Sequence, residues 1–195
     1  MKKAKKVLLL VLCAALLVGA SVAGTVAYLT SKDTVTNTFT VGKVAITMDE
    51  ANVDEYGETL DLTRVQENTY KLIPGHTYTK DPTIRVDAES ENCYLFAEVK
   101  NQISGIEAET TIHNQMVAND WTLMAGSADT YYYKDTCAAG SVVPTFAEFK
   151  IREDVQDLSA YKDLTVVVTA YAVQADGFDT AQDAWDASFG APANP

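Results

Sequence analysis

Alternation of apolar and polar residues with a period of two constrains the fold of this chain more than any other sequence feature. In residues 93–100, Cys, Leu, Ala and Val side chains take one face, while Tyr, Phe and Glu take the other. This period is typical of β-strands. Residues 164–173 are apolar on both faces in their first half, which predicts a central strand. Shorter segments of the same kind lie at residues 44–48, 83–86, 121–124, 130–134 and 142–150.

Two segments have helical rather than strand periodicity. Residues 108–119 predict a short helix, and residues from about 179 to 189 predict a second one with Trp185 in its apolar stripe. Asp179 and Gln182 match a capping box at the start of the second helix. Many short strands with turns between them predict a mainly β fold. We therefore expect a jelly-roll-like β-sandwich with one or two short helices, preceded by a signal-peptide helix.

The N-terminus has the three regions of a secretory signal peptide. Four lysines precede an uncharged apolar run, and small residues follow it. We therefore expect residues 1–27 to be a signal peptide that is cleaved between Ala27 and Tyr28, with a competing site after Ala23. A membrane anchor is the alternative, because the apolar run just reaches the roughly 20 residues that span a bilayer. Cys13 lacks the small preceding residue that a lipoprotein signal requires.

Cleavage leaves a strongly acidic chain. Removal of residues 1–27 takes away four lysines and no acidic residue, so the formal charge changes from −12 to −16. Such a charge repels nucleic acid and anionic lipid. We therefore expect no nucleic-acid partner, and membrane contact only through the uncleaved signal peptide. Residues 28–195 suit a single domain with an extended N-terminal arm at residues 28–40.

Two cysteines, Cys93 and Cys137, remain after cleavage. An exported pair can oxidise, and a bridge that closes this loop would stabilise the fold by about 4 kcal/mol. Two buried free thiols are the alternative, since the sequence does not show whether the side chains approach each other.

The sequence lacks the motifs of common catalytic and metal sites. His76 and His113 lie in separate segments, and neither a His-Glu-x-x-His nor a Gly-x-Ser-x-Gly motif is present. We therefore expect no enzymatic activity and no cofactor. The densest acidic cluster offers oxygen ligands for Ca²⁺ but lacks the alternating aspartates of a dedicated loop, so a solvated loop is expected. Its members are Asp49, Glu50, Asp54 and Glu55.

Segments on both sides of the expected cleavage site resemble a known family of exported proteins. These segments are Ala27-Tyr28-Leu29-Thr30-Ser31, Asn37-Thr38-Phe39-Thr40-Val41-Gly42-Lys43-Val44 and Glu50, followed by Ile73-Pro74-Gly75, Lys80-Asp81-Pro82, Ile84-Arg85-Val86 and residues 88–99. They are similar to the SipW-dependent exported proteins of Gram-positive bacteria, the TasA and camelysin-like family of surface and biofilm matrix proteins. The likeness covers about the first half of the chain.

This resemblance implies cleavage after Ala27 by the signal peptidase SipW, a jelly-roll β-sandwich, and secretion to the extracellular matrix or the cell surface. It also implies fibres in which the arm at residues 28–40 of one subunit adds a strand to the sheet of the next. The partner is then a second copy, or another matrix or surface protein. The alternative is that residues 39–48 form the first strand of their own domain. Camelysin-like relatives are called metallopeptidases, but this sequence offers no metal site to support that activity.

We therefore expect an exported structural or interaction protein of the cell surface or the extracellular (biofilm) matrix that polymerises by N-terminal strand donation. A secreted binding module for a carbohydrate or for a host or cell-surface ligand is the alternative. Its candidate binding surface is Tyr132, in the run Tyr131-Tyr132-Tyr133, because exposed tyrosines make binding surfaces. If this run lies in a strand, two of its tyrosines face inward and one outward.

Overall fold

The computed structural model describes residues 3, 5–8, 11–16 and 42–190, which belong to two compact units, residues 1–40 and 41–195. In the first unit, residues 5–8 and 11–16 are helical and exposed. No helix among the described residues is long and apolar enough to cross a membrane. The cleavage site at Ala27 and Tyr28 and the arm at residues 28–40 lie outside the described residues. The signal peptide and its helix therefore stay predictions.

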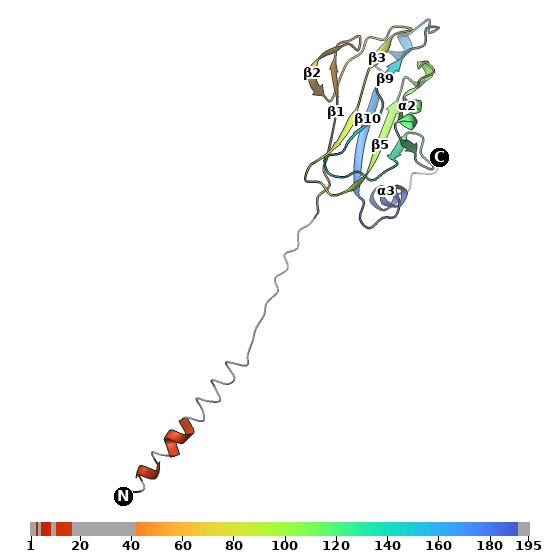
Figure 1. Ribbon diagram of the computed structural model, residues 1–195. Coiled ribbons are helices and arrows are strands. Elements are labelled where there is room, and N and C mark those ends of the chain that lie inside the picture. Colours follow the sequence, from red (N-terminus) through yellow and green to blue (C-terminus); the bar gives the residue numbers. More distant parts are fainter. Residues whose placement is uncertain (1–2, 4, 9–10, 17–41, 191–195) are drawn as a thin grey trace. The chain divides into compact units, whose positions relative to one another are not determined.

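The second unit consists of antiparallel sheets with a few short helices, which confirms the predicted mainly β fold (Figure 1). The strands of residues 42–190 are β1 (Ile46–Val53), β2 (Thr59–Val65), β3 (Thr77–Thr79), β4 (Thr83–Val86), β5 (Cys93–Asn101), β6 (Trp121–Leu123), β7 (Thr130–Tyr133), β8 (Val142–Pro144), β9 (Glu148–Lys150) and β10 (Val166–Gln174). The helices of this unit are η1 (Ser104–Ile106), α2 (Ile112–Ala118), η2 (Ser159–Tyr161) and α3 (Ala181–Phe189).

The two larger sheets contribute their apolar faces to one core. The first has the order β2-β1-β4-β8, the second has the order β10-β5-β7-β6, and β3 and β9 form a small third sheet. Alternation places one side chain in two on the inner face, and the largest fully buried side chains come from all three sheets and from the segments between them. They include Tyr78, Ile84, Leu95, Trp121, Phe146 and Ile151. The arrangement is therefore sandwich-like.

A second, smaller core lies on the other face of the β10-β5-β7-β6 sheet, where α3 covers it. The Trp185 ring lies 4.9 Å from the Phe96 ring and 5.5 Å from the Tyr171 ring, measured between centroids. The structure thus confirms the helix predicted at about 179–189, but the predicted N-cap residue is wrong. Thr180, rather than Asp179, accepts a hydrogen bond from the backbone N–H of Asp183 (3.1 Å).

Three predicted segments differ from the structure in their extent. Residues 49–53, expected in an acidic loop, continue β1, which then forms a hairpin with β2. The expected strand at 142–150 divides into β8 and β9, which belong to different sheets. Residues 42–45 are not in a strand, so the alternative of one continuous first strand over 39–48 is wrong for these four residues.

The most informative difference concerns β10. Its apolar sequence predicts a central strand, yet it lies at the end of its sheet order, next to β5. Its pairing with β5 is regular over nine residues, from Val166 opposite Asn101 to Gln174 opposite Cys93. Within residues 42–190, β10 pairs with β5 and with no other strand. A strand with the sequence of an interior strand therefore has one open edge.

Candidate functional site

The hydrogen bonds at the two ends of β10 show which of its backbone groups face the open edge. Gln102 donates its N–H to the carbonyl of Thr165 (3.1 Å), and Ala175 donates to the carbonyl of Asn92 (2.8 Å). Hydrogen-bonded pairs alternate along an antiparallel ladder. The odd-numbered residues of β10 therefore direct their N–H and C=O groups toward β5.

The even-numbered residues Val166, Val168 and Ala170 consequently direct their backbone groups to the open edge. Their side chains pack against the main core. Unpaired backbone groups at a strand edge form a template for another strand, and soluble proteins usually block such an edge with charges, proline or a bulge. Residues 164–171 of this chain contain no charged residue and no proline.

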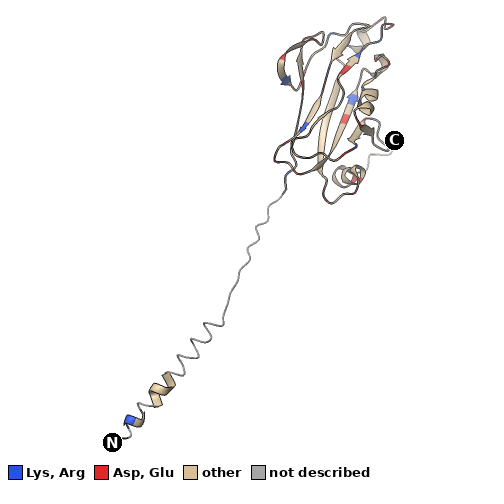
Figure 2. Cartoon of the chain, in the orientation of Figure 1, with Lys and Arg blue, Asp and Glu red and all other residues tan. Residues whose placement is uncertain are grey.

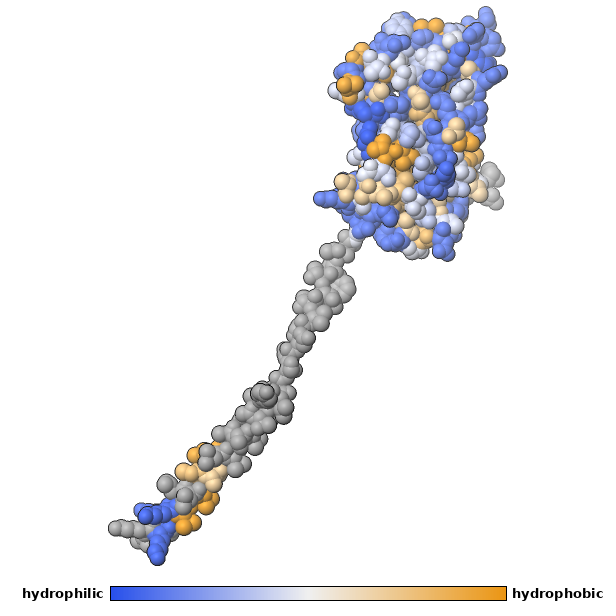
Figure 3. All heavy atoms as spheres, in the orientation of Figure 1, coloured by the Kyte–Doolittle hydropathy of each residue, from blue (hydrophilic) through white to orange (hydrophobic). Residues whose placement is uncertain are grey.

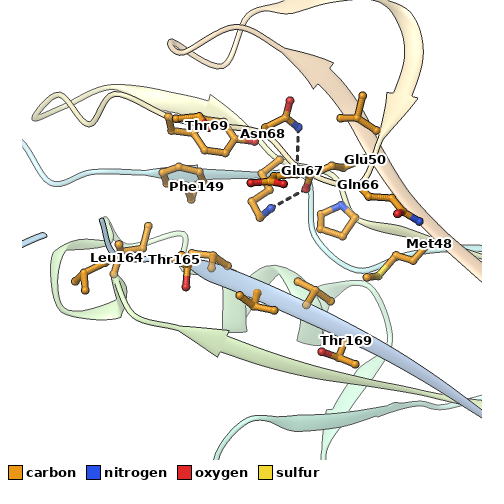
Figure 4. A pocket seen from close by; sticks show the side chains of 18 of the residues that line it. Met48, Glu50, Gln66, Glu67, Asn68, Thr69, Phe149, Leu164, Thr165 and Thr169 are labelled. Carbon is orange, nitrogen blue, oxygen red and sulfur yellow. Dashed lines mark hydrogen bonds and ion pairs between the residues drawn. The ribbon is translucent and has the colours of Figure 1, made fainter. Parts of the chain in front are cut away.

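A groove of about 1030 Å³ runs beside this edge, between β10 and the first half of β1 (Figure 4). The segments at residues 65–72 and 158–165 form its other walls. On the face shown in Figure 3, hydrophobic atoms lie exposed among hydrophilic ones. The apolar side chains that line the groove include Ile46, Met48, Ile103, Phe149, Val166 and Val168.

A neutralised ion pair lies among the polar residues of the groove wall, which also include Gln66, Glu67, Lys162 and Asp163. Lys80 Nζ lies 2.7 Å from Glu50 Oε2, and the side chains are only 11% and 6% exposed. Asn68 Nδ2 donates to Glu50 Oε1 at 2.8 Å (Figure 4). It also donates to the carbonyl of Ala51 at 2.8 Å. The carboxylate and the ammonium group thus satisfy each other, and the groove presents no unpaired charge at this point.

A separate charge network lies on the face of the β2-β1-β4-β8 sheet opposite to Glu50. Asp49 bonds to Arg64 and Arg85, and Arg64 Nη1 also donates to Asp81 Oδ2 (2.9 Å). Arg64 Nη2 donates to the carbonyls of Asp49 and Asp81 and to Thr83 Oγ1, at 3.0 to 3.2 Å. Partial burial raises the pKa of Asp49, but the hydrogen bonds from the two arginines outweigh it and lower this pKa below 3.8. Arg64 therefore joins β1, β2 and the start of β4.

The structure does not bring the four candidate calcium ligands together. Asp49 and Glu50 are neighbours in β1, so their side chains point to opposite faces, where each is paired with basic residues. Asp54 instead accepts the backbone N–H groups of Tyr56 and Glu58 in the turn before β2. In the described part of the chain, no group of three or more His, Cys, Asp or Glu residues could hold a metal ion. Basic and acidic residues both occur on several strands of residues 42–190 (Figure 2).

Cys93 and Cys137 do come together. Each donates its backbone N–H to the carbonyl of the other, at 2.9 and 2.8 Å. Both side chains are buried, and both are thiols in this structure. The histidines have separate partners, since His113 Nδ1 bonds to Tyr131 Oη (2.8 Å) and His76 Nε2 to the carbonyl of Tyr56 (2.8 Å).

Tyr132 lies in β7 and is half-buried. It packs against the second core, which includes Phe96, Met124 and Trp185, whereas Tyr131 and Tyr133 face the main core. The expected alternation is therefore present, and α3 lies on the face toward which Tyr132 points. The ring does not stand free as a flat platform for a ligand.

The sequence led to the prediction of a donated arm, but it did not predict this groove. The groove combines β1, β10 and the segment 65–72, which are far apart in the sequence. One sequence feature indicated the groove: β10 has the apolar composition of a strand that pairs on both sides, although it pairs with β5 alone among residues 42–190. Comparisons with protein-family models, curated proteins and solved structures find no match for this chain.

Proposed function

We propose that this chain is an exported structural protein of the cell surface or extracellular matrix that assembles with copies of itself. Residues 28–40 of one copy enter the groove of the next and add a strand to the open edge of β10. One observation carries this proposal: β10 is uncharged over residues 164–171 and apolar on its inner face, yet lies at a sheet edge beside a groove of mixed apolar and polar lining. An added strand would satisfy its free backbone groups and cover the groove.

The composition of the chain around the arm suits this groove. The arm has one charged residue of each sign, Lys32 and Asp33, and the following residues 34–42 contain none in a chain that is 22% charged. This neutral segment is as long as the nine-residue β10. Burying an unpaired charge is costly, and Glu50 and Lys80 in the groove wall already neutralise each other. A neutral segment is therefore the appropriate occupant.

The arm also has the alternation of a strand that is buried on one face. Val35, Phe39 and Val41 share one face with Asn37, and threonines occupy the other at residues 34, 36, 38 and 40. With the apolar face toward the groove, Phe39 contributes the largest apolar surface. Burying a phenylalanine side chain stabilises by about 1.5–3 kcal/mol, and this would add to the backbone hydrogen bonds of the new ladder.

Electron microscopy of the mature chain, residues 28–195, tests this proposal with a matched pair of arm variants. Phe39→Asp places a charge on the groove-facing side of the arm, and Thr38→Asp places the same charge on the outward side. We expect fibres from the wild type and from Thr38→Asp, and none from Phe39→Asp. Monomers in all three samples across salt and pH, or equal fibre formation by both variants, would contradict arm-driven assembly.

Export is the second part of the proposal. We propose cleavage by a SipW-type signal peptidase between Ala27 and Tyr28, which frees the arm. We also propose a jelly-roll topology for the domain. In support of this topology, the chain changes sheets between β4 and β5 and again between β7 and β8. N-terminal sequencing of the protein recovered from the culture medium or cell surface should find Tyr28 first. A start at Met1 would contradict the export step.

A further inference from the structure

The chain beyond β7 returns to β5 through the two cysteines. β7 pairs with β5 up to Tyr132 opposite Phe96, and the next contact on this flank is the bridge between Cys137 and Cys93. This flank of β5 is the one away from β10, because β10 pairs with Cys93 from the other side, through Gln174. The cysteines therefore lie away from the groove.

The backbone of this bridge brings the two cysteine Cα atoms within reach of a covalent link. The two residues exchange both N–H···O=C bonds, at 2.9 and 2.8 Å, and Cα atoms in such a hydrogen-bonded antiparallel pair are about 5.5 Å apart. This separation lies within the range of about 4.4–6.8 Å that disulfides span. Residues directly opposite each other also point to the same face of a sheet, and both side chains belong to the main core.

We propose that Cys93 and Cys137 form a disulfide in the exported protein. The bond fixes the segment 137–141 to the start of β5. This segment is already paired with the other large sheet, because Gly140 donates to the carbonyl of Val86 (3.1 Å) and Val86 donates to that of Ser141 (2.9 Å). The disulfide therefore joins the two large sheets along the side of the fold away from the groove.

The oxidant is a second disulfide, either a small-molecule disulfide or a thiol–disulfide oxidoreductase outside the cytoplasm. One cysteine thiolate attacks the oxidant and forms a mixed disulfide, which releases the first thiolate of the oxidant. The other cysteine then displaces the second thiolate. In total, two protons leave the protein, two electrons pass to the oxidant, and one sulfur–sulfur bond forms.

Burial determines when this exchange takes place. Both thiols are shielded from solvent in the folded chain. Burial raises the pKa of the Cys93 thiol, and burial together with the neighbouring Cys93 and Asp135 raises that of Cys137 to about 11. Exchange requires an accessible thiolate. The bond therefore forms while the chain folds after export, and the finished bridge resists reductants under native conditions.

Alkylation of the full mature protein in denaturant, followed by intact-mass analysis, tests this proposal. The protein is taken from the culture medium and, separately, refolded from the reduced state with glutathione disulfide. We expect no alkylated cysteine, and a mass lower than that of the dithiol by two hydrogen atoms. Two alkylated cysteines per chain in both preparations would overturn the proposal. Because the chains are denatured, the result is independent of fibre assembly.

A variant series shows whether the bond stabilises this fold. The bond closes the loop between residues 93 and 137. Closure of a loop of this length predicts a thermal midpoint about 10 °C higher for the oxidised wild type than for Cys93→Ala/Cys137→Ala. Dithiothreitol added before unfolding and refolding should remove this difference in the wild type and change nothing in the double variant. Equal midpoints for the oxidised and reduced wild type would refute the stabilising bridge.

Discussion

Replacing Lys80 by methionine breaks the buried ion pair in the groove wall while keeping most of the side-chain volume. Glu50 is then left 6% exposed with Asn68 as its remaining side-chain partner. Removing one partner of a buried pair costs about 3–5 kcal/mol. Because Asn68 still donates to the carboxylate, the lower end, about 3 kcal/mol, is expected. For a domain of this size the thermal midpoint should fall by about 6–12 °C.

Two further variants make this prediction specific. Lys100 pairs with Glu98 at 3.1 Å but is 61% exposed, so Lys100→Met should leave the urea midpoint unchanged. Glu50→Gln combined with Lys80→Met removes both charges and should recover much of the lost stability. Urea unfolding of the four proteins measures these differences. If Lys80→Met is no more destabilising than Lys100→Met, the pair is not buried as described and the reasoning fails.

Two further predictions concern a turn and a charge network. Gly57 has a φ of +80°, and a Cβ there would lie 2.7 Å from Tyr78 Cα, whereas Gly140 has a φ of +77° with nothing within 4 Å. Gly140→Ala should therefore lower the free energy of unfolding only by the left-handed backbone penalty of about 1–2 kcal/mol. Gly57→Ala should lower it by at least about 1 kcal/mol more, measured by urea unfolding. Equal losses in the two variants would contradict the close packing at Gly57. The lowered pKa of Asp49 stabilises the fold above pH 3.8, and this contribution is lost as the pH falls through the folded-state pKa. The urea midpoint of the wild type should thus fall more steeply than that of Asp49→Asn below about pH 4, and parallel curves would argue against the arginine pairing.

The sequence predicted those elements whose pattern is local. β5 follows from strict alternation, and α3 from an apolar stripe that includes Trp185. β1 was misjudged beyond Met48, because Asp49 and Glu50 suggest a loop. Their partners Arg64, Arg85 and Lys80 lie 15 to 36 residues away, and no local pattern shows that they neutralise these acids.

The site was harder to predict than the fold, for a related reason. Apolar composition reports how much of a strand is buried, but not how many strands pair with it, so β10 was expected in the centre of a sheet. β2 was missed, and its Leu62 is fully exposed, so hydrophobicity alone would have misplaced it. The groove itself depends on the approach of β1 and β10, which only the folded chain defines.

Amide exchange of residues 42–195, with and without a synthetic peptide of residues 28–42, tests most directly whether the open edge of β10 receives the arm. NMR resolves the individual amides. The peptide should slow exchange at Val166, Val168 and Ala170, whose N–H groups face the open edge, by at least about tenfold. The odd-numbered amides, already bonded to β5, should change little by comparison. Unchanged exchange at these three residues under saturating peptide, or protection confined to another edge, would contradict strand addition at β10.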